Sequence, residues 1–148
     1  MDLIFEKTIA EIEDFVRQQP EDLLLQICRL LKDRICHYDW VGFYILKNGE
    51  LVLGPYAGKP TAHTHIPVGK GVCGQVAEKK KTIVVQDVSQ ENNYISCSID
   101  VQSEIVVPVL KNAALVAELD IDSRSPAPFR PDDTLFLEKI CFLLSRHF

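Results

Sequence analysis

The chain has 148 residues, of which 47% are apolar and 25% charged, and its formal net charge is −5. This length predicts one domain over residues 1–148, with a core large enough to need no disulfide bonds. The acidic balance argues against a nucleic-acid partner, because a phosphate backbone requires a basic surface.

The predicted elements begin with two helices. Apolar residues recur at helical spacing over residues 3–19, and Pro20 separates this segment from a second helix over 21–36. Two apolar and aromatic runs over 40–56 are joined at Asn48-Gly49, which predicts a β-hairpin because both residues tolerate positive φ.

The second half alternates loops with short elements. Residues 58–71 are rich in Gly and Pro and predict a loop, followed by a short helix over 72–80, a strand over 82–88 and a polar loop over 89–102. Strands over 103–110 and 114–122 flank a turn at Lys111-Asn112, and a helix over 132–148 closes the chain. Hairpins dominate this order, so it predicts an α+β domain whose central, mostly antiparallel sheet is flanked by N- and C-terminal helices.

The stretch "GKGVCG", residues 69–74, matches the pattern G-x-G-x-x-G. A dinucleotide site would also need a buried strand before the glycines and a parallel βαβ unit, and neither is indicated here. We therefore interpret the glycines as a tight turn that places Cys73 in the first turn of a helix. The partial positive charge at a helix N-terminus is expected to lower the pKa of that thiol.

No apolar run reaches the ~18 residues of a membrane span, and acids stand where a secretory signal would carry lysines. We therefore expect a cytoplasmic protein with no membrane partner.

The cysteines divide into two groups. In a reducing compartment its five cysteines are not a disulfide framework. Cys28, Cys36 and Cys141 lie on amphipathic segments and are expected in the core. Cys97 lies in a polar loop and is not readily explained by packing.

Acidic residues follow two of the predicted strands. Glu118, Asp120 and Asp122 alternate, so a strand places all three on one face, and Glu104 begins the neighbouring strand. Carboxylates so close together repel one another unless a cation lies between them. The pattern fits either a cation-binding pocket or the solvated outer face of a sheet.

Five segments occur in an order that resembles the free methionine-(R)-sulfoxide reductases, which are single GAF domains. They are "DWVGFY", "LVLGPYAGKP", "IPVGKGVCG", "SEIVVPV" and "LDIDS", and they run from Asp39 to Ser123. The resemblance implies a GAF-like fold over 1–148 and the reduction of the R epimer of free methionine sulfoxide. It implies no bound cofactor and thioredoxin or glutathione as the reductant. A homodimer is a further partner that we leave open.

The same resemblance implies roles for individual residues. Cys97, seven residues before Glu104, corresponds to the attacking cysteine, and Cys73 to a further redox-active cysteine. The carboxylates that hold the substrate amine correspond to Glu104, Asp120 and Asp122. The aromatic wall around the methyl-sulfoxide end corresponds to Trp40, Tyr44 and Tyr56.

The chain departs from the family pattern at three positions. His63 stands where the family usually has a cysteine that resolves the sulfenic acid, and we regard it as an accessory residue. Ser98 follows Cys97 where an Asp is typical, and Glu118 replaces a small apolar residue.

Two other functions fit the sequence. The first is a GAF module that binds a small molecule without turnover, which the three departures favour. The second is a Zn²⁺ site made from His63, His65, Cys73 and Cys97, although H-x-H with scattered cysteines is loose spacing for such a site. We assign no metal to the enzyme hypothesis.

Overall fold

The computed structural model describes residues 1–94 and 100–148. Its elements are, in chain order, α1 (Leu3–Gln18), α2 (Leu23–Arg34), β1 (Trp40–Lys47), β2 (Glu50–Ala57), β3 (His65–Pro67), α3 (Gly71–Lys79), β4 (Ile83–Val85), η1 (Val88–Gln90), β5 (Ser103–Lys111), β6 (Ala114–Ser123), α4 (Pro131–Leu144) and η2 (Ser145–His147). None of the helices in these two ranges is both long and apolar enough to cross a lipid bilayer.

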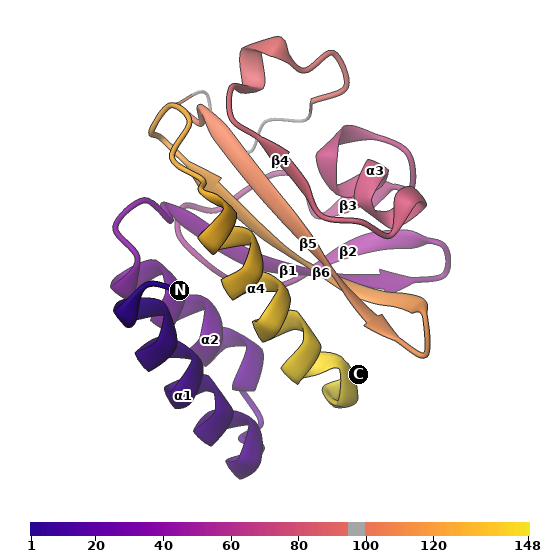
Figure 1. Cartoon of the computed structure of the whole chain (residues 1–148). Coiled ribbons are helices and arrows are strands. Elements are labelled where there is room, and N and C mark those ends of the chain that lie inside the picture. Colours follow the sequence, from indigo (N-terminus) through magenta and orange to yellow (C-terminus); the bar gives the residue numbers. More distant parts are fainter. Residues whose placement is uncertain (95–99) are drawn as a thin grey trace.

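The strands form one sheet in the order β3-β2-β1-β6-β5-β4, and every neighbouring pair is antiparallel. Helices α1, α2 and α4 cover one face, while α3 lies against the other (Figure 1). The α+β prediction with a central antiparallel sheet and flanking terminal helices is therefore confirmed.

The side chains on the two faces of the sheet belong to two separate hydrophobic cores. The larger core lies under α1, α2 and α4 and takes Val41, Phe43, Leu119 and Ile121 from the sheet. The smaller core lies under α3 and includes Trp40, Tyr44, Val106 and Cys73 among its members. Because strand residues alternate between faces, the acidic positions of β6 fall on the α3 side.

Turn residues explain where the strands reverse. Asn48 and Gly49 adopt φ of 50° and 80°, which confirms the predicted hairpin between β1 and β2. The β5–β6 turn lies one residue later than predicted, at Asn112 and Ala113, whose φ values are 52° and 66°. Strand β3 falls inside the segment predicted to be a loop. The sequence did not indicate it because the strand is only three residues long and buries only Ile66.

The predicted core cysteines do not all behave alike. Cys28 and Cys141 are buried as expected, but Cys36 is exposed. Helix α2 ends at Arg34, two residues earlier than predicted, so Cys36 does not continue its apolar face. The prediction of a core position is wrong for Cys36.

Candidate functional site

Four carboxylates converge on the α3 side of the sheet through strand register. On β6, Glu118, Asp120 and Asp122 pair with Tyr44, Gly42 and Trp40 of β1, in that order. On the other side of β6, Asp122 pairs with Glu104 of β5. The register thus places the predicted acids and two predicted aromatic residues on adjacent positions of one face.

These acids are deeply buried. Exposure is 4% for Glu104, 0% for Glu118, and 1% for both Asp120 and Asp122. The alternative of a solvated sheet face is therefore wrong, because α3 packs over this part of the sheet. Buried carboxylates are costly unless they are protonated or neutralised by a cation.

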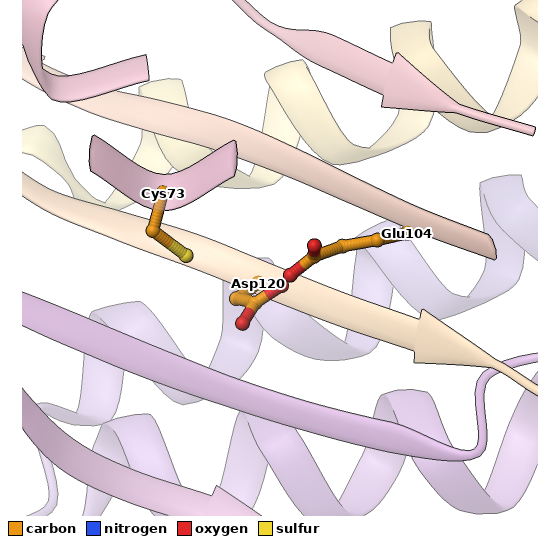
Figure 2. A group of neighbouring side chains, drawn as sticks. All are labelled: Cys73, Glu104 and Asp120. Carbon is orange, nitrogen blue, oxygen red and sulfur yellow. The ribbon is translucent and has the colours of Figure 1, made fainter. Parts of the chain in front are cut away.

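Cys73 lies next to the carboxylate cluster, on the side of α3. It projects from α3 toward Asp120 on β6, and Glu104 reaches the same point from β5 (Figure 2). One ligand atom from each of these three residues lies within 4.8 Å of the other two. A narrow cavity adjoins them, lined by Tyr44, His63, Ile66, Gly71, Val72, Cys73, Glu104 and Asp120.

The surroundings of Cys73 reverse one expectation from the sequence. Burial raises the pKa of the Cys73 thiol well above its ordinary value, and the charges of Asp120 and Glu104 raise it further. The prediction that Cys73 is a thiolate at the start of α3 is therefore wrong for the resting protein. Removal from water and four acidic neighbours outweigh the partial charge of a nine-residue helix.

Two carboxyls in the cluster also favour their protonated forms. Burial, with a contribution from Asp120, raises the pKa of Glu118 from 4.5 to about 9. Burial likewise raises the pKa of Asp120, against hydrogen bonds with Glu104 and Cys73 that favour its charged form. Asp120 and Glu104 can share a hydrogen bond only if one of the two carboxyls carries a proton.

The aromatic wall is built around Trp40. Its ring stacks on Tyr56 with centroids 5.5 Å apart, and its Nε1 donates a hydrogen bond to the Lys59 carbonyl over 2.9 Å. A Cβ atom at Gly42 would lie 2.3 Å from the indole, and one at Gly58 would lie 2.6 Å from it. Both glycines are therefore needed for the indole to occupy this position.

The glycine turn before α3 is tied to the polar loop by Asn93. Asn93 Oδ1 accepts a hydrogen bond from the Gly71 amide, and its Nδ2 donates to the Gly69 carbonyl, both over 2.9 Å. Gly69 and Gly71 have φ of 93° and 65°, in the left-handed region that glycine adopts at the least cost. The glycine motif shapes a turn that presents Cys73, as the sequence predicted.

A second cavity, of about 320 Å³, lies at the ends of β1 and β6. It is lined by Lys32, Asp39, Trp40, Gly58, Lys59, Asp100, Val101, Asp122, Ser123 and Arg124. Trp40 and Asp122 face this outer cavity, whereas Tyr44, Glu104 and Asp120 line the narrow one. The predicted substrate residues therefore span two neighbouring cavities.

Not every predicted residue can be placed at this site. Cys97 lies within 95–99, outside the described residues. His63 is half-buried and lines the narrow cavity. His65 is exposed on β3 with its ring beside Thr64, so it does not join His63 and Cys73. Tyr56 contributes by stacking on Trp40.

The sequence did not indicate two residues as members of this site. Glu118 was placed on the acidic face of its strand but given no role at the site, and it is fully buried beside Cys73. Asn93 was one of several polar loop residues with nothing to distinguish it. The roles of both are recognised only through tertiary contacts.

Comparison with known proteins agrees with this geometry. A model of the GAF domain matches residues 19–148. GAF domain-containing protein A of Dictyostelium discoideum is 35% identical over 143 residues, which cover 95% of this chain and 89% of that protein. The fold of this chain and its match to the GAF-domain model therefore define it as a GAF-domain protein.

The similarity extends to a narrower group. Free methionine-R-sulfoxide reductase of Escherichia coli K12 is 36% identical over 79% of this chain and 70% of that protein. Free methionine-R-sulfoxide reductase from Neisseria meningitidis, solved in complex with its substrate, superposes with a TM-score of 0.91 at 35% identity, covering 100% of this chain and 91% of that one. The chain belongs to the free methionine-R-sulfoxide reductase family of GAF-domain proteins.

Proposed function

We propose that this protein reduces free L-methionine-(R)-sulfoxide to methionine, with Cys97 as the attacking thiol and Cys73 as the resolving thiol. The observation that carries the proposal is the buried cluster of Glu104, Asp120 and Asp122 beside an aromatic wall and a cysteine. Family membership supports the same reaction.

The acids suit the ammonium group of a free amino acid. A cation placed among buried carboxylates relieves their mutual repulsion and restores interactions that burial removed. A peptide nitrogen carries no charge, and the chain beyond it would have to enter the same enclosed space. The acidic pocket therefore favours free methionine sulfoxide over a sulfoxide within a protein.

The aromatic residues suit the other end of the substrate. The indole of Trp40 lines the outer cavity and stacks on the ring of Tyr56 behind it, which gives an apolar aromatic surface. A methyl sulfoxide is partly apolar, so contact with these rings favours its binding without a charged partner. Ammonium recognition at Asp120 and Asp122 would fix the direction in which the sulfoxide points.

The proposed reaction has three steps, and each takes place at a cysteine sulfur. The Cys97 thiolate attacks the sulfoxide sulfur, the oxygen passes to Cys97 as a sulfenic acid, and methionine leaves. The protonated carboxyl of the Asp120–Glu104 pair is the nearby source of a proton for the oxygen. Cys73 then condenses with the sulfenic acid, forming a disulfide and water, and an external dithiol such as thioredoxin reduces the disulfide by exchange.

The position of Asn93 supports the pairing of these two thiols. Asn93 is bonded to Gly71, two residues before Cys73, so the segment that leads to position 97 starts beside α3. On the far side of that segment, Asp100 forms ion pairs with Lys59 and Arg124 at the outer cavity. The described residues on both flanks therefore lie next to the proposed site.

Steady-state reduction tests the proposal. Purified protein with dithiothreitol should convert free L-methionine-(R)-sulfoxide but neither the S epimer nor an N-acetylated sulfoxide. Trp40 is the only tryptophan in the sequence, so its fluorescence reports substrate binding directly. Asp120→Asn should weaken that fluorescence response, and equal conversion of the free and N-acetylated sulfoxides would refute recognition by the acids.

The alternative is a GAF module that binds the amino acid without turnover. The raised pKa of Cys73 and the histidine at position 63 favour it, since both make recycling harder. It predicts the same fluorescence response but no methionine product. The two functions therefore differ in product formation alone.

A further inference from the structure

We propose that Cys73, Glu104 and Asp120 form a binding site for Zn²⁺, which the protein holds when no amino acid occupies the pocket. The site lies in the interior, under α3, and uses donors from α3, β5 and β6 (Figure 2). The binding claim is independent of the reductase activity, whereas its regulatory consequence rests on the proposed function.

The geometry of the three donors fits this ion. Their ligand atoms lie within 4.8 Å of one another. Zn–S and Zn–O bonds of about 2.3 Å and 2.1 Å place tetrahedral ligands roughly 3.5 Å apart, so shifts of about 1 Å complete the site. The narrow cavity, which His63 also lines, leaves the fourth position open to water. Three protein ligands with one open position is a common arrangement for zinc.

Glu118 provides a second, independent indication of a cation at this point. It is fully buried, and neither of its carboxylate oxygens accepts a hydrogen bond of ordinary geometry from the described residues. It nevertheless lies close enough to Cys73 to influence that thiol. Beside three metal-type donors, a buried acid whose oxygens lack such a partner would gain from a cation bound among them, because the cation stabilises its charged form.

The donor set selects the metal. A thiolate is a soft ligand that favours zinc over magnesium or calcium, which prefer oxygen alone. Binding breaks the S–H bond of Cys73 and forms a Zn–S bond, and the displaced thiol proton, together with the proton shared by Asp120 and Glu104, passes to the buffer. No oxidant or reductant is required for this exchange.

Zinc at this position would block the proposed reaction in two ways. It would hold the resolving thiol as a metal thiolate, and it would occupy carboxylates that otherwise receive the substrate ammonium group. Zinc and methionine sulfoxide should therefore compete, and each should weaken the binding of the other.

The test measures metal binding directly. Reduced, metal-free protein in a Cys36→Ser background, which removes the exposed thiol next to His37, is titrated with Zn²⁺ against a chromogenic chelator. We expect one ion per chain. Loss of an outer-shell partner weakens metal binding by about 10–100-fold. The loss of zinc affinity in Glu118→Gln should fall within that range. Cys73→Ser removes a direct ligand, so its loss of affinity should be larger. Cys28→Ser, in the larger core on the other face of the sheet, should bind as the background does.

Cobalt provides a spectroscopic signature of the ligand. Co²⁺ bound through Cys73 should give a sulfur-to-metal charge-transfer band that Cys73→Ser abolishes and Cys141→Ser retains. Circular dichroism confirms that each variant is folded. Unchanged binding in Cys73→Ser, equal affinity for Mg²⁺, or loss of binding only in the His63→Gln/His65→Gln double variant would each overturn the proposal. Reductase activity of the metal-free protein is measured separately, so either claim can fail alone.

Discussion

The Tyr44 hydroxyl donates a hydrogen bond to the carbonyl oxygen of His63 over 2.8 Å. This bond joins β1, at the floor of the site, to the loop that precedes β3. Tyr44→Phe should lower the free energy of unfolding by about 0.5–1.5 kcal/mol, since the carbonyl loses a buried donor. Urea denaturation measures the loss, with Tyr56→Phe as the control. Equal losses in both variants would show that the hydrogen bond has no special role.

Glu118→Gln should change how stability depends on pH. The pKa of Glu118 is raised from 4.5 to about 9, so the folded state holds a proton that the unfolded state releases between these values. Stability due to this group is therefore present below about pH 4.5 and is lost as pH rises toward about 9.

The amide has no such proton to retain. Relative to the native chain, Glu118→Gln should gain at least about 1 kcal/mol in unfolding free energy between pH 6 and pH 8, because one pH unit corresponds to about 1.4 kcal/mol. Urea unfolding at both pH values measures the difference. A constant gap between the two proteins would mean that Glu118 is ionised in the folded state.

Asn93→Ala should uncouple the polar loop from the glycine turn. The variant loses two hydrogen bonds, to Gly71 and Gly69, that hold the turn before Cys73. We expect the rate of dithiothreitol-driven turnover to fall roughly 10-fold, the size of effect that poor positioning of reacting groups produces. Asn92→Ala is the matched control, since the neighbouring Asn92 is exposed and makes none of these bonds. Equal rates in the two variants would remove this role.

His63→Cys should create a second resolving thiol. Positions 63 and 73 line the same narrow cavity, so a thiol at 63 can exchange with an oxidised Cys73. Thioredoxin-driven turnover should rise about several-fold over the native chain if disulfide exchange limits it. Peptide mapping after oxidation should recover a 63–73 link. Ala62→Cys, at an exposed position beside it, should give no gain. A gain of the same size there would point to general thiol reactivity.

Periodicity and turn residues were enough to predict most of the elements in order, because these signals are local. The Asn48-Gly49 hairpin and the alternation of Asp120 with Asp122 depend only on neighbouring residues, and both predictions are confirmed. Strand β3 escaped prediction because one buried residue, Ile66, carries no period.

The chemical state of the site could not be predicted in the same way. Whether Glu104 and Asp120 face water or protein depends on where α3 packs, which no local pattern encodes. The pKa of Cys73 was expected to fall from its helix position alone. It rises mainly because the thiol is buried, and further because of acids 31 to 49 positions away in the sequence. Burial of an acidic cluster becomes visible only once the sheet register is known.

A single-turnover experiment tests the proposed reduction most directly. Reduced, chelator-treated protein is mixed with free L-methionine-(R)-sulfoxide without any reductant, and the methionine formed per chain is measured after rapid quenching. The proposed chemistry predicts about one methionine per chain, because one attacking thiol accepts one oxygen atom. Cys73→Ser should give the same yield and Cys97→Ser none. A yield near zero from folded, reduced native protein would contradict the reductase function and leave a pocket that binds without reacting.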